Sequence, residues 1–194
     1  MITFRTAAQR VASVAAVSAL VITALAGAAT AEIEGFQDAR GDVSQGADIE
    51  MVRVVNGDER VKVKVFHRDL VRSYKSGSSL AVYIDTNRER TGPEYVFQGA
   101  TFEGGDYALL KAKGFAAAGS RQVPLNGGTY LMRLDYAEDV ATIKIDRVVL
   151  RSPGRIRVEV KTGAELLPAG NEEPSNAKDW LGTPESFTSW VKRG

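Results

Sequence analysis

Hydrophobic and polar residues alternate along much of the chain from residue 49 onward. The segment 59–67, ERVKVKVFH, places its valines on one face and its lysines on the other, and the segment 154–161, GRIRVEVK, repeats the pattern. The segment 79–85, SLAVYID, is more uniformly apolar, as is typical of a central strand. A period of two residues is that of half-buried β-strands, so the pattern predicts a protein built from strands.

Turn-forming residues separate these strands. Asn56-Gly57 lies between two alternating segments and is the strongest short signal for a β-hairpin. About eight strands are expected, with a ninth near the C-terminus, at residues 49–55, 60–67, 79–85, 94–99, 105–112, 129–136, 140–146, 155–161 and 186–192. Their apolar positions predict a core that contains Val61, Val63, Val65, Val82, Ile84, Ile143, Ile145, Ile156, Val158 and Val160. Short strands joined by hairpin turns predict an all-β fold, a single antiparallel β-sandwich of about eight or nine strands with a jelly-roll or immunoglobulin-like architecture.

Three segments do not fit this alternation. Residues 32–48 are rich in glycine and acids and are expected to form a loop, and residues 68–76 are expected to form one or two helical turns. From about residue 163 the chain is rich in proline and glycine, which predicts an irregular segment wrapped on the surface. We therefore expect one domain over residues 32–194 with an irregular C-terminal part.

The first 31 residues have the layout of a secretory signal peptide. Arg5 and Arg10 precede an apolar stretch from about residue 11 to 26, and Ala29-Thr30-Ala31 matches the small residues of a cleavage site. The alternative is a retained membrane anchor, but the run is interrupted by polar residues and is shorter than the roughly 20 apolar residues of a span. We expect cleavage after Ala31, export to the extracellular space or cell envelope, and no membrane attachment afterwards.

Composition narrows the classes of partner and chemistry. Two of the 25 basic residues lie in the leader, so the remaining chain carries 23 basic against 24 acidic residues. This near-neutral balance argues against nucleic acid as a partner, because such binding requires a concentrated basic surface. The chain has no cysteine and a single histidine, His67, which excludes disulfides, thiol catalysis and multi-histidine metal sites. The fold must be held by its core alone.

Five aspartates lie in expected loops or at strand ends: Asp38, Asp42, Asp48, Asp85 and Asp106. Calcium takes about six to eight oxygen ligands from flexible loops, and acids at strand ends are a source of them. The same residue type also shapes turns and caps backbone N–H groups. The sequence leaves both interpretations open, a calcium site or turn residues alone.

Four aromatic residues are candidates for a ligand platform: Trp180, Trp190, Tyr83 and Tyr95. Sugar rings have apolar C–H faces that stack on a flat aromatic side chain. The alternative is structural, with the tryptophans anchoring the C-terminal segment and the tyrosines packing between strands. Burial of each ring distinguishes the two.

Several short motifs resemble those of a known group of secreted domains. These are D-x-x-G-D at 38–42, A-D-I at 47–49, V-Y-I-D-T-N at 82–87, T-G-P-E-Y at 91–95 and G-G-D-Y at 104–107. Their order is similar to that in bacterial β-sandwich domains related to family-nine carbohydrate-binding modules and DOMON-like domains. The resemblance implies a sandwich, sugar binding, and a calcium site at Asp38, Asp48 and Asp85.

Three functions follow from these observations. The first is a secreted, non-catalytic binding or interaction domain whose partner is a polysaccharide or another envelope protein. The second is a carbohydrate-binding module, stabilised by calcium, for envelope or environmental glycan, which an exposed Trp–Tyr platform would favour. The third is a small hydrolase, which a deep cleft with a carboxylate pair, or with His67 and Asp69, would favour.

Overall fold

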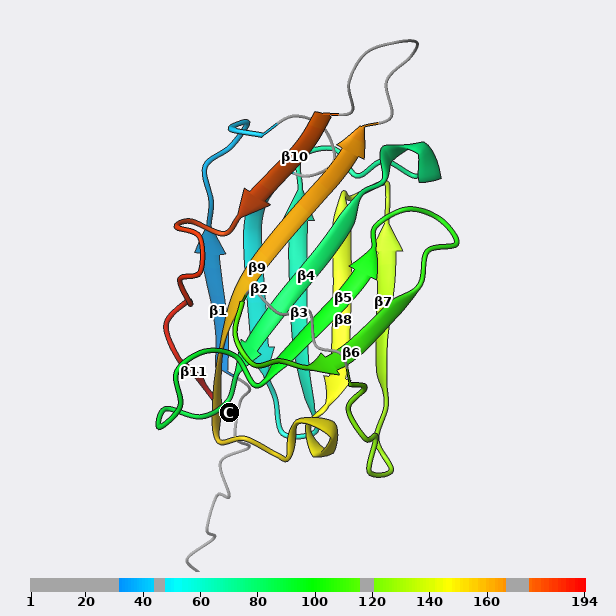
Figure 1. Ribbon diagram of the computed structural model, residues 1–194. Coiled ribbons are helices and arrows are strands. Elements are labelled where there is room, and N and C mark those ends of the chain that lie inside the picture. The colour runs from blue at the N-terminus through cyan, green and yellow to red at the C-terminus, as the bar shows by residue number, and fades with distance from the viewer. Residues whose placement is uncertain (1–31, 44–47, 116–120, 167–174) are drawn as a thin grey trace, which may run out of the picture.

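The computed structural model describes residues 32–43, 48–115, 121–166 and 175–194, and it shows a β-sandwich of two antiparallel sheets (Figure 1). The first sheet has the strand order β1 (Glu32–Gln37), β2 (Ile49–Asn56), β3 (Arg60–His67), β8 (Val140–Asp146) and β7 (Tyr130–Asp135). The second has the order β10 (Ser175–Trp180), β9 (Arg155–Leu166), β4 (Ser79–Asp85), β5 (Tyr95–Ala100) and β6 (Tyr107–Lys111), and β11 (Val191–Lys192) pairs with β9. The predicted all-β sandwich is confirmed.

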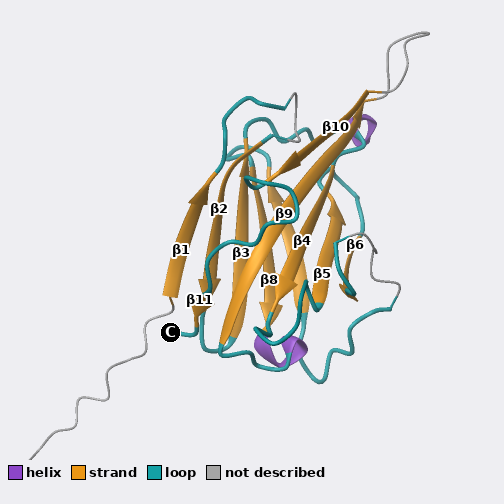
Figure 2. Ribbon diagram, turned by 60° about the vertical axis from the view of Figure 1, so that its left-hand side comes forward, coloured by secondary structure: helices purple, strands orange, loops and turns teal. Residues whose placement is uncertain are grey.

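The two sheets lie one behind the other (Figure 2), and the buried hydrophobic residues of both form one core. All ten residues of the expected core are buried, each with 0% of its surface exposed. Burying an aliphatic side chain of this size contributes roughly 1.5–3 kcal/mol relative to leaving it in water. The two-residue alternation therefore correctly predicted which residues lie on the inner faces of both sheets.

The helical segments are short. Residues 74–76, within the expected helical turns at 68–76, form a single 3-10 turn, η1 (Tyr74–Ser76), capped by the Ser73 hydroxyl at Lys75 N–H. A second 3-10 turn, η2 (Arg147–Leu150), follows β8 directly. No helix among the described residues is long and apolar enough to cross a membrane. The expected signal peptide, residues 1–31, lies outside the described ranges.

Both ends of the domain differ from the expectation. Residues 32–37 form strand β1 along β2 rather than a loop, with Phe36 paired to Val52. Within the segment from residue 163 that was expected to be irregular, β9 continues to Leu166 and β10 returns along it, whereas residues 181–190 form no helix or strand and residues 167–174 lie outside the described ranges. The expected ninth strand at 186–192 is reduced to β11. Both missed strands, β1 and β10, are sheet edges, where polar residues are tolerated and the alternation is weak.

Candidate functional site

The outer face of the second sheet carries a groove. The register places Gly163 beside Lys178 on β10 and beside Ser79 on β4, and it places Lys161 beside Ala81. Because Val160 faces the core, Lys161 and Gly163 point outward with their neighbours. The rows continue across β5 and β6, where Ala81 pairs with Gln98 and Gln98 with Ala108.

The floor of this groove consists of small side chains. Its volume is about 980 Å³, and it is lined along the floor by Ser79, Ala81, Ala100, Ala108 and Gly163. A Cβ atom at Gly163 would lie 3.6 Å from Ser79 Oγ and 3.5 Å from the Ala177 carbonyl oxygen, which are ordinary contacts. The hollow therefore exists because these positions lack bulk, and a Cβ atom can be added at Gly163 without backbone strain.

Aromatic residues close one end of the groove. Tyr83 lines it together with Phe115, and the two rings meet edge to face with centroids 5.1 Å apart. The Tyr83 hydroxyl donates to the Phe115 carbonyl at 3.2 Å. Trp180 stacks on Tyr83 at 6.2 Å with an interplanar angle of 12°, and it packs beside the groove rather than lining it.

The other two candidate aromatic residues lie elsewhere. Tyr95 is 3% exposed and belongs to the core between the sheets, so its ring cannot meet a ligand on the outer face. Trp190 is half-buried, with the guanidinium carbons of Arg88 and Arg157 at 5.3 and 4.7 Å from its ring centroid. Of the four candidates, only Tyr83 lines the groove. Four further residues that line the groove were not predicted from the sequence, because they belong to no motif: Gln98, Lys161, Gly163 and Lys178.

A cluster of carboxylates lies at one edge of the sandwich. Asp42 and Asp48, from the segment between β1 and β2, meet Asp179 of β10, with ligand atoms all within 4.8 Å of one another. Asp48 is fully buried and accepts from Gly41 N–H at 2.9 Å, and Asp179 is 4% exposed and accepts from Ile49 N–H at 2.6 Å. This acidic cluster offers oxygen ligands from the β1–β2 connection and from β10.

The electrostatics of the acidic cluster favour a proton or a cation. Burial, with the charges of Asp38 and Asp42 nearby, raises the pKa of Asp179 to about 6. Burial also raises the pKa of Asp48, with Asp42 adding to the effect. Asp38 is close to this edge, since its Oδ1 accepts from Gly182 N–H at 2.8 Å. Like charges held together out of water are stabilised by a bound divalent cation.

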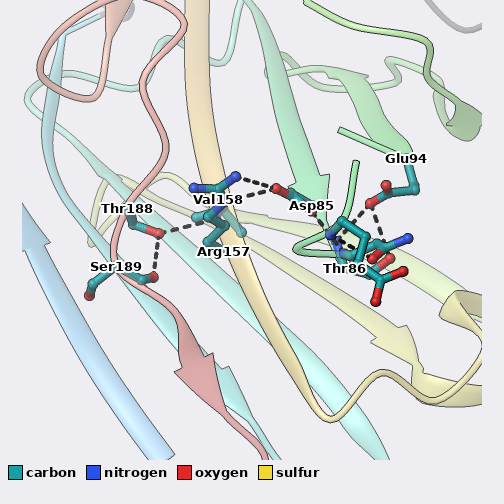
Figure 3. Close-up of polar contacts among 9 residues, drawn as sticks. Asp85, Thr86, Glu94, Arg157, Val158, Thr188 and Ser189 are labelled. Atoms are coloured by element: carbon teal, nitrogen blue, oxygen red, sulfur yellow. Dashed lines mark hydrogen bonds and ion pairs between the residues drawn. The ribbon is translucent and has the colours of Figure 1, made fainter. Parts of the chain in front are cut away.

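Asp85, one of the five expected ligands, lies apart from this cluster. Its carboxylate is fully buried and forms an ion pair with Arg157, its register partner on β9, at 2.6 Å (Figure 3). Its other oxygen accepts from Asn87 N–H at 2.9 Å. Glu94 likewise accepts from Thr86 N–H at 2.8 Å, so these two acids shape the loop between β4 and β5.

Asp106 is also separate from the acidic cluster. It precedes β6 and lines the groove, where its backbone carbonyl accepts from Ala100 N–H. Asp179, in contrast, was not among the expected ligands, because its sequence neighbours give no sign that β10 carries it to Ile49, 130 positions away in the chain.

Glu159 is a buried acid that forms no ion pair within the described ranges. It points to the outer face of the second sheet beside Tyr83, is 0% exposed, and neither carboxyl oxygen has a hydrogen-bond partner among the described residues. Burial, with the charge of Asp38 as a smaller contribution, raises its pKa to about 9. The carboxyl group is therefore protonated at neutral pH.

Comparison with known proteins adds no assignment. No protein-family model matches the chain, and no curated protein matches it significantly. The resemblance to family-nine carbohydrate-binding modules and DOMON-like domains thus stays an expectation. The class of ligand has to be argued from the groove and from the acidic cluster.

Proposed function

We propose that the protein is an exported, non-catalytic binding module that holds a carbohydrate chain in the groove on the second sheet. A sugar chain needs an open, shallow site, a few fixed polar groups and an aromatic face. The groove offers Ser79 and Gln98 as polar groups and the half-buried ring of Phe115 as an aromatic face, while Tyr83, 5% exposed, supports that ring through their edge-to-face contact. Its described lining contains one carboxylate, Asp106, whereas glycoside hydrolysis generally uses two, which supports binding rather than cleavage.

The observation that carries this proposal is the floor of small side chains. A sheet face that only meets water is normally covered by long polar residues, because they are well solvated and protect the strands. Here Gly163, Ser79 and Ala81 stand side by side across β9 and β4. An outer face without bulk leaves backbone and small polar groups accessible to a flat ligand.

The test fills the groove. We would measure retention of residues 32–194 on insoluble polysaccharides and on a glycan array, and repeat it with Gly163→Leu. Leucine at this position projects into the groove and should abolish retention while leaving the melting temperature nearly unchanged. Gly35→Leu is the matched control, because Gly35 is also a strand glycine and a Cβ there has no atom within 4 Å. Retention by Gly163→Leu equal to that of the parent would refute the proposal, and a parent that binds only an envelope protein would favour the interaction-domain alternative.

A second proposal concerns the acidic cluster, which we infer binds calcium. The carboxylates of Asp42, Asp48 and Asp179 converge within 4.8 Å, and Asp38 stands close by. Oxygen ligands from a loop and a strand end are what calcium uses, with water or backbone carbonyls completing the shell. Such an ion would link the β1–β2 connection to β10 and so stabilise the sandwich without taking part in the groove.

Export is the third part of the proposal. The charged, apolar and small-residue order of residues 1–31 supports cleavage after Ala31. Intact mass spectrometry of secreted material should give a chain that begins at Glu32. A membrane-bound product that still carries the leader would contradict it.

A further inference from the structure

We propose that the groove selects an anionic polysaccharide, one that carries carboxylate or sulfate groups along its chain. This inference rests on the proposed function, since it concerns the ligand of the same groove. It comes from the charges on the groove wall rather than from its floor.

Two lysines form the wall of the groove on the β9–β10 side. Lys161 and Lys178 both line the groove, and the register places both on the outer face, because Lys178 pairs with Gly163, two positions from Lys161. Neither ammonium group has a carboxylate within 4.0 Å among the described residues. Two positive charges that have no carboxylate partner in the described part of the chain therefore face the same cavity.

The position of Lys161 is fixed by an aromatic ring. Its Nζ lies 4.9 Å from the Trp180 ring centroid, and Trp180 is held in turn by its stack on Tyr83. A cation–π contact orients an ammonium group but leaves its N–H donors available. This gives Trp180 an indirect role: it positions the charge of Lys161 instead of stacking on a sugar.

The negative charge in the groove lies on the opposite side. Asp106 precedes β6, and three strands separate β6 from β10 in the sheet order. Neighbouring strands are about 4.8 Å apart, so Asp106 is roughly 14 Å from the strand of Lys161 and roughly 19 Å from the strand of Lys178, too far to neutralise either charge. A ligand along the groove thus meets a positive end where its anionic groups are stabilised.

The experiment compares chains that differ only in charge. Binding of residues 32–194 would be measured by affinity electrophoresis and calorimetry, in chelator, with polygalacturonate against its fully methyl-esterified form and with dextran sulfate against dextran. We expect tighter binding to at least one charged polymer than to its neutral parent, and weakening of this binding as sodium chloride is raised. The two pairs distinguish carboxylate from sulfate as the recognised group.

The variant Lys161→Gln/Lys178→Gln should reduce affinity for the charged polymer by about fivefold to tenfold, since each exposed ion contact contributes about 1 kcal/mol or less. Lys62→Gln/Lys144→Gln is the matched control, because these lysines are register partners on the outer face of the first sheet. Both variants replace surface side chains, and their melting temperatures should match the parent. Equal binding of charged and neutral polymers, or an unchanged preference in Lys161→Gln/Lys178→Gln, overturns the inference while the proposed function stands. Absence of binding to every polysaccharide overturns both.

Discussion

The outer faces of the two sheets are built on different principles although their inner faces are alike. On the first sheet, Lys62 and Lys64 stand beside Lys144 and Thr142, so the centre of this face carries long or hydroxylated side chains. On the second, the central positions are Gly163, Ser79 and Ala81. The central positions of the first sheet have the composition expected from solvation alone, and those of the second need another explanation.

The second sheet also buries groups on its outer side. Tyr83 and Glu159 point away from the core and yet are 5% and 0% exposed. The chain after β10 runs along β9, with Leu181 N–H donating to the Val160 carbonyl and Thr188 N–H to the Val158 carbonyl. The outer face of the second sheet thus has a covered region and an open groove. The covered region explains why a strand such as β4 has a more uniformly apolar sequence than the strands of the first sheet.

The largest expected effect on stability comes from a substitution on the inner faces of the sheets, which are alike. Val63→Asp places a charge in the core between the sheets, where Val63 is 0% exposed, and should cost several kcal/mol, enough to unfold a domain whose total stability is about 5–15 kcal/mol. Lys62→Asp, one position away on the outer face, should change the unfolding free energy by less than about 1 kcal/mol. Urea unfolding of both variants measures the difference, and equal tolerance would mean that the faces are assigned wrongly.

The ion pairs on the two outer faces should differ in their contribution to stability. Arg157→Met leaves the fully buried Asp85 without its partner and should cost about 3 kcal/mol. Arg60→Met removes the more exposed pair with Asp146 on the first sheet, where the Arg60 side chain is 57% exposed, and should cost much less because solvent screens that pair. Chemical denaturation of both variants tests this, and similar losses would remove the contrast.

Calcium should act at the edge where the sheets meet. At a hundredfold excess over its dissociation constant, an ion that binds only the folded state adds about 2.7 kcal/mol, which corresponds to a rise in melting temperature of roughly 5–10 °C for a chain of this length. Asp179→Asn should abolish this rise, while Asp106→Asn, which lies in the groove, should preserve it. An unchanged melting temperature between chelator and millimolar calcium would leave these acids as turn residues.

The buried Glu159 in the covered part of the second sheet should make the unfolding free energy depend on pH. Because the pKa of Glu159 is raised to about 9 from 4.5, the folded state holds a proton that the unfolded chain releases. Stability is therefore present at low pH and is lost as pH rises between these values, by up to about 1.4 kcal/mol per pH unit. Glu159→Gln keeps the neutral shape and should remove this slope, which unfolding curves at pH 6, 7 and 8 would measure. Parallel profiles for the two proteins would contradict the assignment.

The fold could be predicted wherever one face of a strand is buried and the other is solvated. The segment 59–67 shows this, since its valines are buried and its lysines are not. Strand β1 escaped detection because its polarity is inverted: Ile33 is 61% exposed while its neighbours are half-buried. An alternation whose apolar residue faces water carries no signal for a strand.

The site could be predicted only in part, because its partners come from distant segments. The proximity of Asp42 and Asp48 follows from their short separation in the sequence, but Asp179 joins them only through the path of β10. Nothing in the sequence indicated that Asp85 forms an ion pair, because its partner, Arg157, is 72 positions away. Asp85 was therefore expected among the metal ligands. The groove could not be predicted from the sequence, since a position such as Gly163 forms it by having no side chain and belongs to no motif.

The seam between β4 and β9 has a kinetic consequence. Ser79 pairs with Gly163 across it, so the groove straddles two parts of the chain that meet only when a long loop closes. Hairpins such as β4–β5 can form locally and early, whereas pairing of this range is slow, and no disulfide holds the segments together meanwhile. Ligand capture during refolding should therefore recover later than the circular dichroism of the strands, which makes the groove a reporter of the final pairing step.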